Sequence, residues 1–183
     1  FKTPGSSALL NENPALRPWH HAADAAWQVA LTHGRLSILD LSTNGHQPMI
    51  LQSASIAVCF NGEIFNYVEL REELRKKGHQ FYTNTDTEVI LHAWSEWGID
   101  CLKRFNGMFA FLLLDCRTNE LYAVRDRFGV KPLYYSSVED YTVFASEAKQ
   151  IRCLPGFRFG VNEKVALDYL QSSQLDANEN TFD

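Results

Sequence analysis

The stretch Asn61-Gly62-Glu63, at the end of the apolar run of residues 56–60, constrains the fold of this chain most. Asn-Gly after a strand is among the strongest short turn signals, and alone it favours a β-hairpin. Residues 66–77 do not supply the second strand, because their apolar positions have helical spacing and Gly78 is suited to end a helix. The sequence therefore predicts a strand that ends at Asn-Gly and turns into a helix.

Such a strand-to-helix turn would free two hydrogen-bond donors to point at one spot, the backbone N–H of Gly62 and the side-chain amide of Asn61. An oxyanion hole requires donors of this kind, and one donor is typically worth about 3 kcal/mol of transition-state stabilisation. Glu63, next along the chain, would place a carboxylate within reach of the positive end of a substrate. We therefore predict half of an active site here, with a plain hairpin turn as the alternative.

Length and charge exclude several classes of protein. A chain of 183 residues has the length of one domain and buries roughly two-thirds of its unfolded surface without added staples. With 45% hydrophobic residues and a net charge of −5, it shows no basic stripe for nucleic acid. No apolar run approaches the ~20 residues that span a membrane. We expect no nucleic-acid or membrane partner and, since no signal peptide is recognisable, a cytoplasmic location.

The cysteines and histidines show no metal-binding pattern. The cysteines lie far apart, without a C-x-x-C pair, at Cys59, Cys101, Cys116 and Cys153. We interpret them as thiols of a reducing compartment rather than as disulfides or metal ligands. The histidines complete no ligand set with them, and no glycine-rich phosphate loop is present. We therefore predict no metal and no cofactor in this chain.

Hydrophobic spacing and turn residues predict an α+β fold with antiparallel sheet. A second helix begins at Thr85-Asp86-Thr87-Glu88, whose cap and early acidic residues suit the positive end of a helix, and Gly98 ends it. Besides residues 56–60, the predicted strands are residues 26–31, 36–41, 109–114, 121–125, 133–136 and 142–145, and a loop covers residues 42–48. We assign residues 1–171 to the domain and the polar residues 172–183 to the start of a linker.

A set of motifs is far more specific in combination than any of its members. In chain order the motifs are Gly34-Arg35-Leu36-Ser37-Ile38-Leu39-Asp40, Gly45-His46-Gln47-Pro48-Met49, Phe60-Asn61-Gly62-Glu63-Ile64-Phe65-Asn66-Tyr67, Thr85-Asp86-Thr87-Glu88, Phe105-Asn106-Gly107-Met108-Phe109-Ala110-Phe111, and Arg125-Asp126-Arg127-Phe128-Gly129-Val130-Lys131-Pro132-Leu133-Tyr134-Tyr135. Over residues 20–170 they closely resemble the glutaminase domain of glutamine-dependent asparagine synthetases, which are class II amidotransferases.

The resemblance implies a four-layer αββα sandwich of two mostly antiparallel sheets, of the N-terminal-nucleophile hydrolase type. In that family an N-terminal cysteine attacks the side-chain amide of L-glutamine, with its own α-amine as the natural base. Ammonia leaves, and water resolves the glutamyl thioester. The implied partner is a C-terminal synthetase domain that receives the ammonia and amidates aspartate. ATP and Mg²⁺ are expected only in that domain, and a homodimer is left open.

The resemblance also implies which charged residues hold the two ends of glutamine. Arg35 matches the arginine that grips the α-carboxylate, where a planar guanidinium gives bidentate hydrogen bonds. A surface arginine at a strand end is the alternative. Glu63 and Asp86 match the two carboxylates that hold the α-ammonium. Asp86 also suits a plain helix cap, and both roles can coexist.

The resemblance also implies roles for uncharged residues. Asn61 and Gly62 match the oxyanion hole. Leu36 and Ile38 match the wall near the substrate, although as strand residues they suit the core equally well. We interpret the segment at residues 125–135 as a structural strand-turn-strand without a catalytic part.

The nucleophile that the resemblance implies is missing from this sequence. We expect Phe1 to follow directly after the family's opening Cys-Gly-Ile-x-Gly strand, which places the cysteine a few residues upstream. Cys59 is nearest to Asn61 in sequence, but it sits in an apolar strand and lacks a free α-amine, so we do not assign it this role. A second departure is His20-His21-Ala22-Ala23-Asp24, which stands where the family has His-Arg-Gly-Pro-Asp.

Three hypotheses about function follow. The first is the glutaminase part of an asparagine-synthetase-type ligase whose opening residues are missing here. The second is a non-catalytic scaffold, as in lactam-forming relatives that kept the fold and lost the chemistry. The third is a glutaminase that serves a different carboxylate acceptor. The first is favoured over the second because the chain retains every expected glutamine ligand, namely Arg35, Asn61, Gly62, Glu63 and Asp86.

Overall fold

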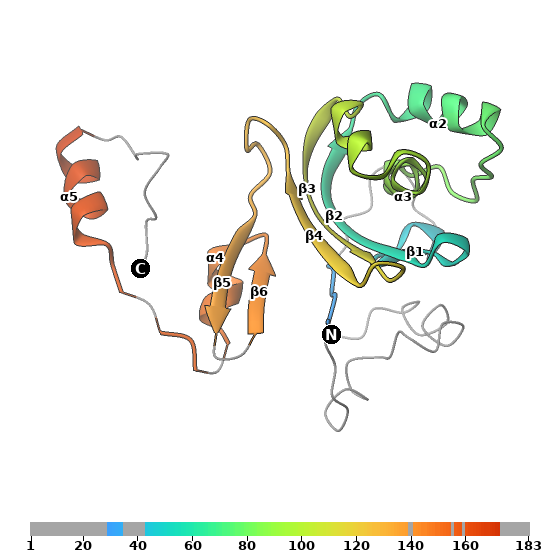
Figure 1. Ribbon diagram of the computed structural model, residues 1–183. Coiled ribbons are helices and arrows are strands. Elements are labelled where there is room, and N and C mark those ends of the chain that lie inside the picture. The colour runs from blue at the N-terminus through green and yellow to red at the C-terminus, as the bar shows by residue number, and fades with distance from the viewer. Residues whose placement is uncertain (1–28, 35–42, 139–140, 155, 159, 173–183) are drawn as a thin grey trace. The chain divides into compact units, whose positions relative to one another are not determined.

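The computed structural model describes residues 29–34, 43–138, 141–154, 156–158 and 160–172 (Figure 1). The chain forms two compact units, Phe1–Pro132 and Leu133–Asp183. The predicted strand at residues 36–41 and nearly all of the predicted linker lie outside the described residues.

Within the described residues, the first unit is built on a four-stranded antiparallel sheet with the strand order β1-β2-β3-β4. The strands are β1 (Met49–Leu51), β2 (Ile56–Ile64), β3 (Gly107–Asp115) and β4 (Glu120–Arg125). The helices between β2 and β3 are α2 (Tyr67–Lys76) and α3 (Asp86–Trp97), and short 3-10 helices occur at Thr43–Gly45, Gln52–Ala54 and Gly98–Lys103. The central pair of strands therefore brings together segments that are far apart in the sequence (Figure 1).

Both helices form where the sequence predicts them. α3 begins after Thr85, whose side-chain oxygen accepts a hydrogen bond from the Glu88 backbone N–H at 3.2 Å. This is the ordinary way to satisfy a free donor at the start of a helix. The helix ends at Gly98, which adopts a positive φ of 57°.

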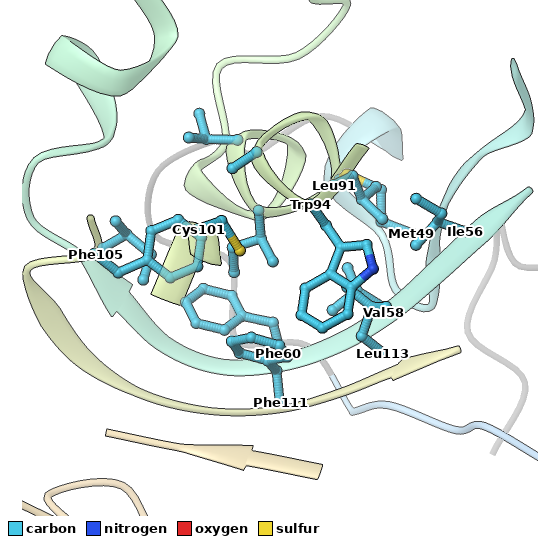
Figure 2. Close-up of a cluster of buried hydrophobic side chains, with 14 of the residues drawn as sticks. Met49, Ile56, Val58, Phe60, Leu91, Trp94, Cys101, Phe105, Phe111 and Leu113 are labelled. Carbon is cyan, nitrogen blue, oxygen red and sulfur yellow. The ribbon is translucent and has the colours of Figure 1, made fainter. Parts of the chain in front are cut away.

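The hydrophobic core lies on one face of this sheet, because alternate residues of a strand point to the same face. From β2 and β3 the core takes Ile56, Val58, Phe60, Ile64, Phe109, Phe111 and Leu113, and from α3 it takes Val89, Ile90, Leu91, Ala93 and Trp94 (Figure 2). The Trp94 indole N–H donates to Asp115 at 3.3 Å, which gives its polar atom a partner within the core. The remaining side chains of β2, among them Asn61 and Glu63, therefore point to the opposite face.

The second unit contains a two-stranded antiparallel sheet of β5 (Tyr134–Val138) and β6 (Tyr141–Ala145). It also contains the helices α4 (Ala148–Arg152) and α5 (Glu163–Ser172). The predicted strands at residues 133–136 and 142–145 are confirmed. The expected α+β class with antiparallel sheets is confirmed as well.

The predicted end of the strand at Asn61-Gly62 is wrong, because β2 continues to Ile64. Asn61 pairs with Ala110 and Gly62 with Phe109 of β3. A turn signal reports only local preference, whereas a pairing strand that arrives later in the sequence keeps these residues extended.

Residues 29–34 lie alongside β2 without joining the sheet. The sequence predicts a strand at residues 26–31, but the described part of it, residues 29–31, is not a strand. The His33 Nε2–H donates to the Phe60 carbonyl at 3.1 Å, and the Cys59 Sγ–H contacts the Thr32 carbonyl at 3.8 Å. Side-chain contacts thus replace the backbone ladder that the predicted strand requires.

Gly62 is required by the close approach of β2 and β3. Its φ is +152°, a conformation that residues with a side chain rarely adopt. A Cβ atom at this position would lie 2.2 Å from the Met108 carbonyl oxygen. The glycine of the Asn-Gly pair therefore serves strand contact rather than a turn.

We expect Gly62→Ala to lower the free energy of unfolding by roughly 2–4 kcal/mol, because it adds backbone strain and a steric clash together. Urea unfolding of the purified chain measures this. Gly160→Ala is the matched control, since nothing lies within 4 Å of its added Cβ. The control should change stability by less than about 0.5 kcal/mol. Equal stability of the two variants would contradict the strand geometry.

Candidate active site

The direction of each backbone N–H on β2 follows from its ladder with β3. In an antiparallel pair, alternate residues turn their N–H and C=O groups to opposite edges of the strand. The Phe65 N–H donates to the Asn106 carbonyl at 2.7 Å, and the Cys116 N–H donates to the Ser55 carbonyl at 3.0 Å. Odd-numbered residues of β2 therefore face β3. Even-numbered residues, including Gly62, face the opposite edge, on which β1 pairs.

Side chains cap this edge on both sides of Gly62. The Phe60 N–H donates to Gln47 Oε1 at 2.5 Å, and Gln47 Nε2 donates to the Phe60 carbonyl at 3.1 Å. The Ile64 N–H donates to Asp86 Oδ2 at 3.0 Å. Among the residues that the structure describes, no group accepts a hydrogen bond from the Gly62 N–H. Within this part of the chain the Gly62 N–H is therefore open, and the reason is the short β1 rather than the predicted turn.

Asn61 and Glu63 flank Gly62 with side chains on the face away from α3. Both are half-buried, and Asn61 stands opposite the small Ala110 of β3. The Asn61 amide and the Gly62 N–H are therefore consecutive polar donors at one end of β2, the first on a face of the sheet and the second at its edge. The prediction that both groups point at one spot stays a prediction.

Asp86 is only 5% exposed and carries a second carboxylate to this end of β2. Burial raises its pKa above the ordinary value, backbone hydrogen bonds from Ile64 and Thr87 act against this, and the charge of Glu63 raises the pKa further. Within the described ranges, neither carboxylate is paired with a lysine, arginine or histidine. Two nearby carboxylates without a cation favour a positively charged ligand.

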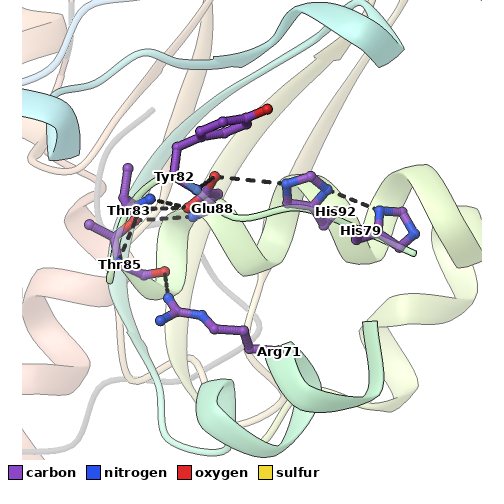
Figure 3. A network of polar contacts seen from close by, with 7 residues as sticks. All are labelled: Arg71, His79, Tyr82, Thr83, Thr85, Glu88 and His92. Carbon is purple, nitrogen blue, oxygen red and sulfur yellow. Dashed lines mark hydrogen bonds and ion pairs between the residues drawn. The ribbon is translucent and has the colours of Figure 1, made fainter. Parts of the chain in front are cut away.

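A polar network holds the loop that precedes Asp86 (Figure 3). The Glu88 carboxylate accepts hydrogen bonds from the Tyr82 N–H at 2.8 Å and the Thr83 N–H at 2.7 Å, and Arg71 Nη2 donates to the Thr85 carbonyl at 2.8 Å. Burial alone would raise the pKa of Glu88, but hydrogen bonds from His92, Tyr82 and Thr83 outweigh it and lower the pKa. The first turn of α3 is thereby fixed to its own approach loop.

The network extends beyond Glu88 to two histidines. His92 Nε2 lies 3.8 Å from Glu88 Oε1, and the Nδ1 atoms of His79 and His92 lie 3.0 Å apart (Figure 3). His79 Nε2 in turn lies 3.0 Å from Glu96 Oε2. Sequence reasoning missed this support for Asp86, although the acidic residue at the third helical position of Thr85-Asp86-Thr87-Glu88 signalled a structured helix start.

The loop after β4 is organised around a single carboxylate. Asp126 accepts hydrogen bonds at 3.0 or 3.1 Å from the backbone N–H groups of Phe109, Phe128, Val130 and Lys131. Burial alone would raise the pKa of Asp126, but these four bonds lower it to about 2. This fits the interpretation of the segment as structural. A surface pocket of about 350 Å³ next to the loop contains none of the predicted site residues.

The other predicted site residues lie outside the described residues. Arg35, Leu36 and Ile38 belong to this group, as does the stretch at residues 20–24. The structure therefore brings together Asn61, Gly62, Glu63 and Asp86. Their roles in binding and catalysis stay predictions.

The surroundings of Cys59 in β2 disfavour an ionised thiol. Burial raises the pKa of its thiol to about 12, so the reactive thiolate is scarce near neutral pH. Within the described ranges, no group of three or more histidine, cysteine or acidic side chains is placed to hold a metal ion. In the same residues, no helix combines the length and apolar character needed to cross a membrane.

Comparisons with known proteins agree with this geometry. A family model described as a glutamine amidotransferase domain matches residues 18–183. The chain is 46% identical over 117 residues to the glutamine-hydrolyzing asparagine synthetase 1 of Bacillus subtilis, covering 64% of this chain and 18% of that protein. It is 45% identical over 133 residues to the glutamine-hydrolyzing asparagine synthetase 3 of Arabidopsis thaliana, covering 68% and 22%. The chain thus spans about a fifth of these relatives.

A solved structure shows the same fold. The glutamine phosphoribosylpyrophosphate amidotransferase of B. subtilis, complexed with ADP and GMP, matches with a TM-score of 0.57 and 27% identity. The match covers 66% of this chain and 28% of that one. The expected fold of N-terminal-nucleophile hydrolase type is confirmed.

We expect Asp86→Asn to stabilise the chain at pH 7. A pKa raised in the folded state means that folding disfavours the charged carboxylate, and the neutral amide can still accept the Ile64 N–H. The gain should be largest above the raised pKa and shrink as pH falls toward the ordinary aspartate value near 3.9. Urea unfolding at pH 7 and pH 4 measures the gain in the free energy of unfolding and its decrease with falling pH.

Asp100→Asn is the control for this change. The Lys103 ammonium donates to Asp100 and lowers its pKa, so no gain is expected there. A loss of stability in Asp86→Asn at pH 7 would mean that Asp86 contributes to folding as a charged group.

Proposed function

The chain belongs to the glutamine amidotransferase domain family, and on this premise we propose that it binds L-glutamine and supplies the oxyanion donors for hydrolysis of the side-chain amide, while the attacking cysteine is not among the residues of this sequence. One observation carries the proposal. The open N–H of Gly62 lies on the strand that also carries Glu63, and Glu63 and Asp86 form a carboxylate pair without a cation among the described residues. Donors for an oxyanion thus stand beside acceptors for an ammonium group.

In the proposed binding mode, Glu63 and Asp86 accept hydrogen bonds from the α-ammonium of glutamine. The new positive charge would lower the pKa of Asp86, opposing the effects of burial and of Glu63. Arg35 would grip the α-carboxylate in bidentate fashion, with Leu36 and Ile38 as the wall beside the side chain. These contacts fix both ends of the backbone of glutamine and leave its side-chain amide to reach the oxyanion donors.

In the proposed reaction, a thiolate adds to the carbonyl carbon of the glutamine side chain. The carbonyl oxygen becomes negative, and the Asn61 amide and Gly62 N–H stabilise it, each by about 3 kcal/mol. The tetrahedral intermediate collapses by breaking its C–N bond, ammonia leaves with the proton that the α-amine of the cysteine took from the thiol, and a glutamyl thioester forms. Water then hydrolyses the thioester to glutamate and regenerates the thiol. The attacking cysteine is the N-terminal one expected ahead of Phe1.

For the whole protein, we propose that the ammonia serves the amidation of aspartate. The relatives are named asparagine synthetases and are several times longer than the match, so the proposal includes a synthetase domain as partner, with ATP and Mg²⁺ acting there. A cytoplasmic location belongs to the same proposal.

We expect Glu63→Gln and Asp86→Asn each to weaken binding of L-glutamine about tenfold to a hundredfold, because each removes a hydrogen bond between charged groups. Isothermal calorimetry on the chain extended by the family's opening cysteine segment measures the affinity. Glu72→Gln, on the exposed side of α2 and paired with Arg75, is the control and should bind normally.

An analogue without the α-amine tests the assignment to the ammonium group. Glutaramate, which keeps the amide and the carboxylate, should bind with similar affinity to the unmodified chain and to Asp86→Asn. If both variants lose affinity for glutamine and for glutaramate to the same extent, the carboxylates do not recognise the α-ammonium group. Absence of any heat from the unmodified chain would contradict glutamine binding altogether.

We expect Asn61→Ala to lower kcat for glutamine hydrolysis about 10²- to 10³-fold, with a smaller effect on KM, because an oxyanion donor acts mainly in the transition state. Glutamate release by the full-length protein measures this. A rise in KM with unchanged kcat would instead assign Asn61 to ground-state binding.

A further inference from the structure

The edge of β2 is completed by a side chain at the point where a strand would be expected. Gln47 forms two hydrogen bonds with Phe60, one to its N–H at 2.5 Å and one from its own amide to the Phe60 carbonyl at 3.1 Å. A carboxamide carries the same donor and acceptor as a peptide group. It therefore makes both hydrogen bonds that the backbone of a neighbouring strand would make.

The register of β1 shows what this substitution achieves. Met49 pairs with Val58, so a longer β1 would place the backbone of residue 47 opposite Phe60 and that of Gly45 opposite Gly62. The Gly62 N–H would then bond to the Gly45 carbonyl and be lost to any ligand. In the structure β1 begins at Met49, Gly45 belongs to a 3-10 helix, and the side chain of Gln47 takes the place of the strand.

We propose that Gln47 is a positioning residue that ends the β1–β2 ladder two residues before Gly62 and so keeps the Gly62 N–H open as an oxyanion donor. The inference rests on the proposed function of Gly62. It gives a role to the Gly45-His46-Gln47-Pro48-Met49 motif. Gln47 acts through Phe60 and Gly62 rather than by touching the substrate.

Phe60 also receives a hydrogen bond from a second segment of the chain. The Phe60 carbonyl also accepts a hydrogen bond from His33 Nε2 at 3.1 Å, so the segments at residues 29–34 and 43–48 meet at one backbone group. Phe60 is 4% exposed, so water does not readily replace a lost partner. Gln47 and His33 thereby share one acceptor, and the bond from His33 holds the segment at residues 29–34 to β2.

Two variants separate the bonds that Gln47 makes. Gln47→Met keeps the length of the side chain and removes both bonds, whereas Gln47→Glu keeps the acceptor for the Phe60 N–H and loses the donor. Gln52→Met is the control, since Gln52 is exposed in the 3-10 helix that follows β1. Each is made in the full-length protein for kinetics and in the chain itself for amide hydrogen exchange.

Amide exchange tests the geometry without glutamine. We expect the Phe60 N–H to exchange at least tenfold faster in Gln47→Met and close to the native rate in Gln47→Glu and Gln52→Met. The Gly62 N–H should exchange quickly in the unmodified chain. A protected Gly62 N–H there, or an unchanged Phe60 rate in Gln47→Met, overturns the proposal.

Kinetics test the positioning role. We expect kcat for glutamine hydrolysis to fall about tenfold in Gln47→Met, corrected for active-site content, with KM changed less than threefold and with partial recovery in Gln47→Glu. A merely structural role would lower the active fraction and leave kcat per active site unchanged, and that result overturns the proposal. If the unmodified enzyme neither binds nor hydrolyses glutamine, the proposed function fails, while the exchange rates still decide whether Gln47 completes the edge.

Discussion

The antiparallel pairing of β2 with β3 is the interaction on which the rest of this structure depends. It joins nine residue pairs from Ile56–Asp115 to Ile64–Gly107. A single register fixes three properties of β2 together, namely which side chains enter the core, which backbone groups bond to β3, and which face the outer edge. A slip by one residue would turn Phe60 out of the core and Gly62 toward β3.

The carboxylates at the end of β2 show how the fold maintains an arrangement that is electrostatically unfavourable in the absence of a ligand. Asp86 is buried close to Glu63, and both effects raise its pKa. The cost is tolerated because the core under α3 and the network around Glu88 hold the helix start from both sides. Perturbed titratable groups of this kind concentrate at functional sites, where ligand binding relieves them.

Some parts of this arrangement can be predicted from neighbouring residues in the sequence, whereas others depend on contacts between distant segments. The start of α3 was predictable, because the Thr85 cap, the acidic first turn and the closing Gly98 are all local signals. Asn61, Gly62 and Glu63 lie on one strand, β2, whereas the sequence predicted a turn there, and their place in one site stays a prediction. The partner that keeps them extended is β3, which a local pattern cannot reveal.

Gln47 is another residue whose role cannot be predicted from a local sequence pattern. Nothing in its immediate neighbours indicates that its side chain replaces a strand, because that role depends on the register of β1 against β2. The support of Asp86 by Arg71 and Glu88 likewise depends on how α2 packs beside α3. The expectations for Arg35, Leu36 and Ile38 rest on resemblance alone, since they lie outside the described residues.

The separation of β2 and β3 in the sequence also bears on how the protein acquires its site. Both helices α2 and α3 lie between the two strands, so the ladder closes only after the intervening loop entropy has been overcome. Contacts of such long sequence separation slow folding and form with the global structure rather than ahead of it. A chain that has folded only its helices would hold Asp86 at a helix start but would have no oriented Gly62. Site assembly and completion of the fold are therefore one event, and a partly folded chain has no half-active form.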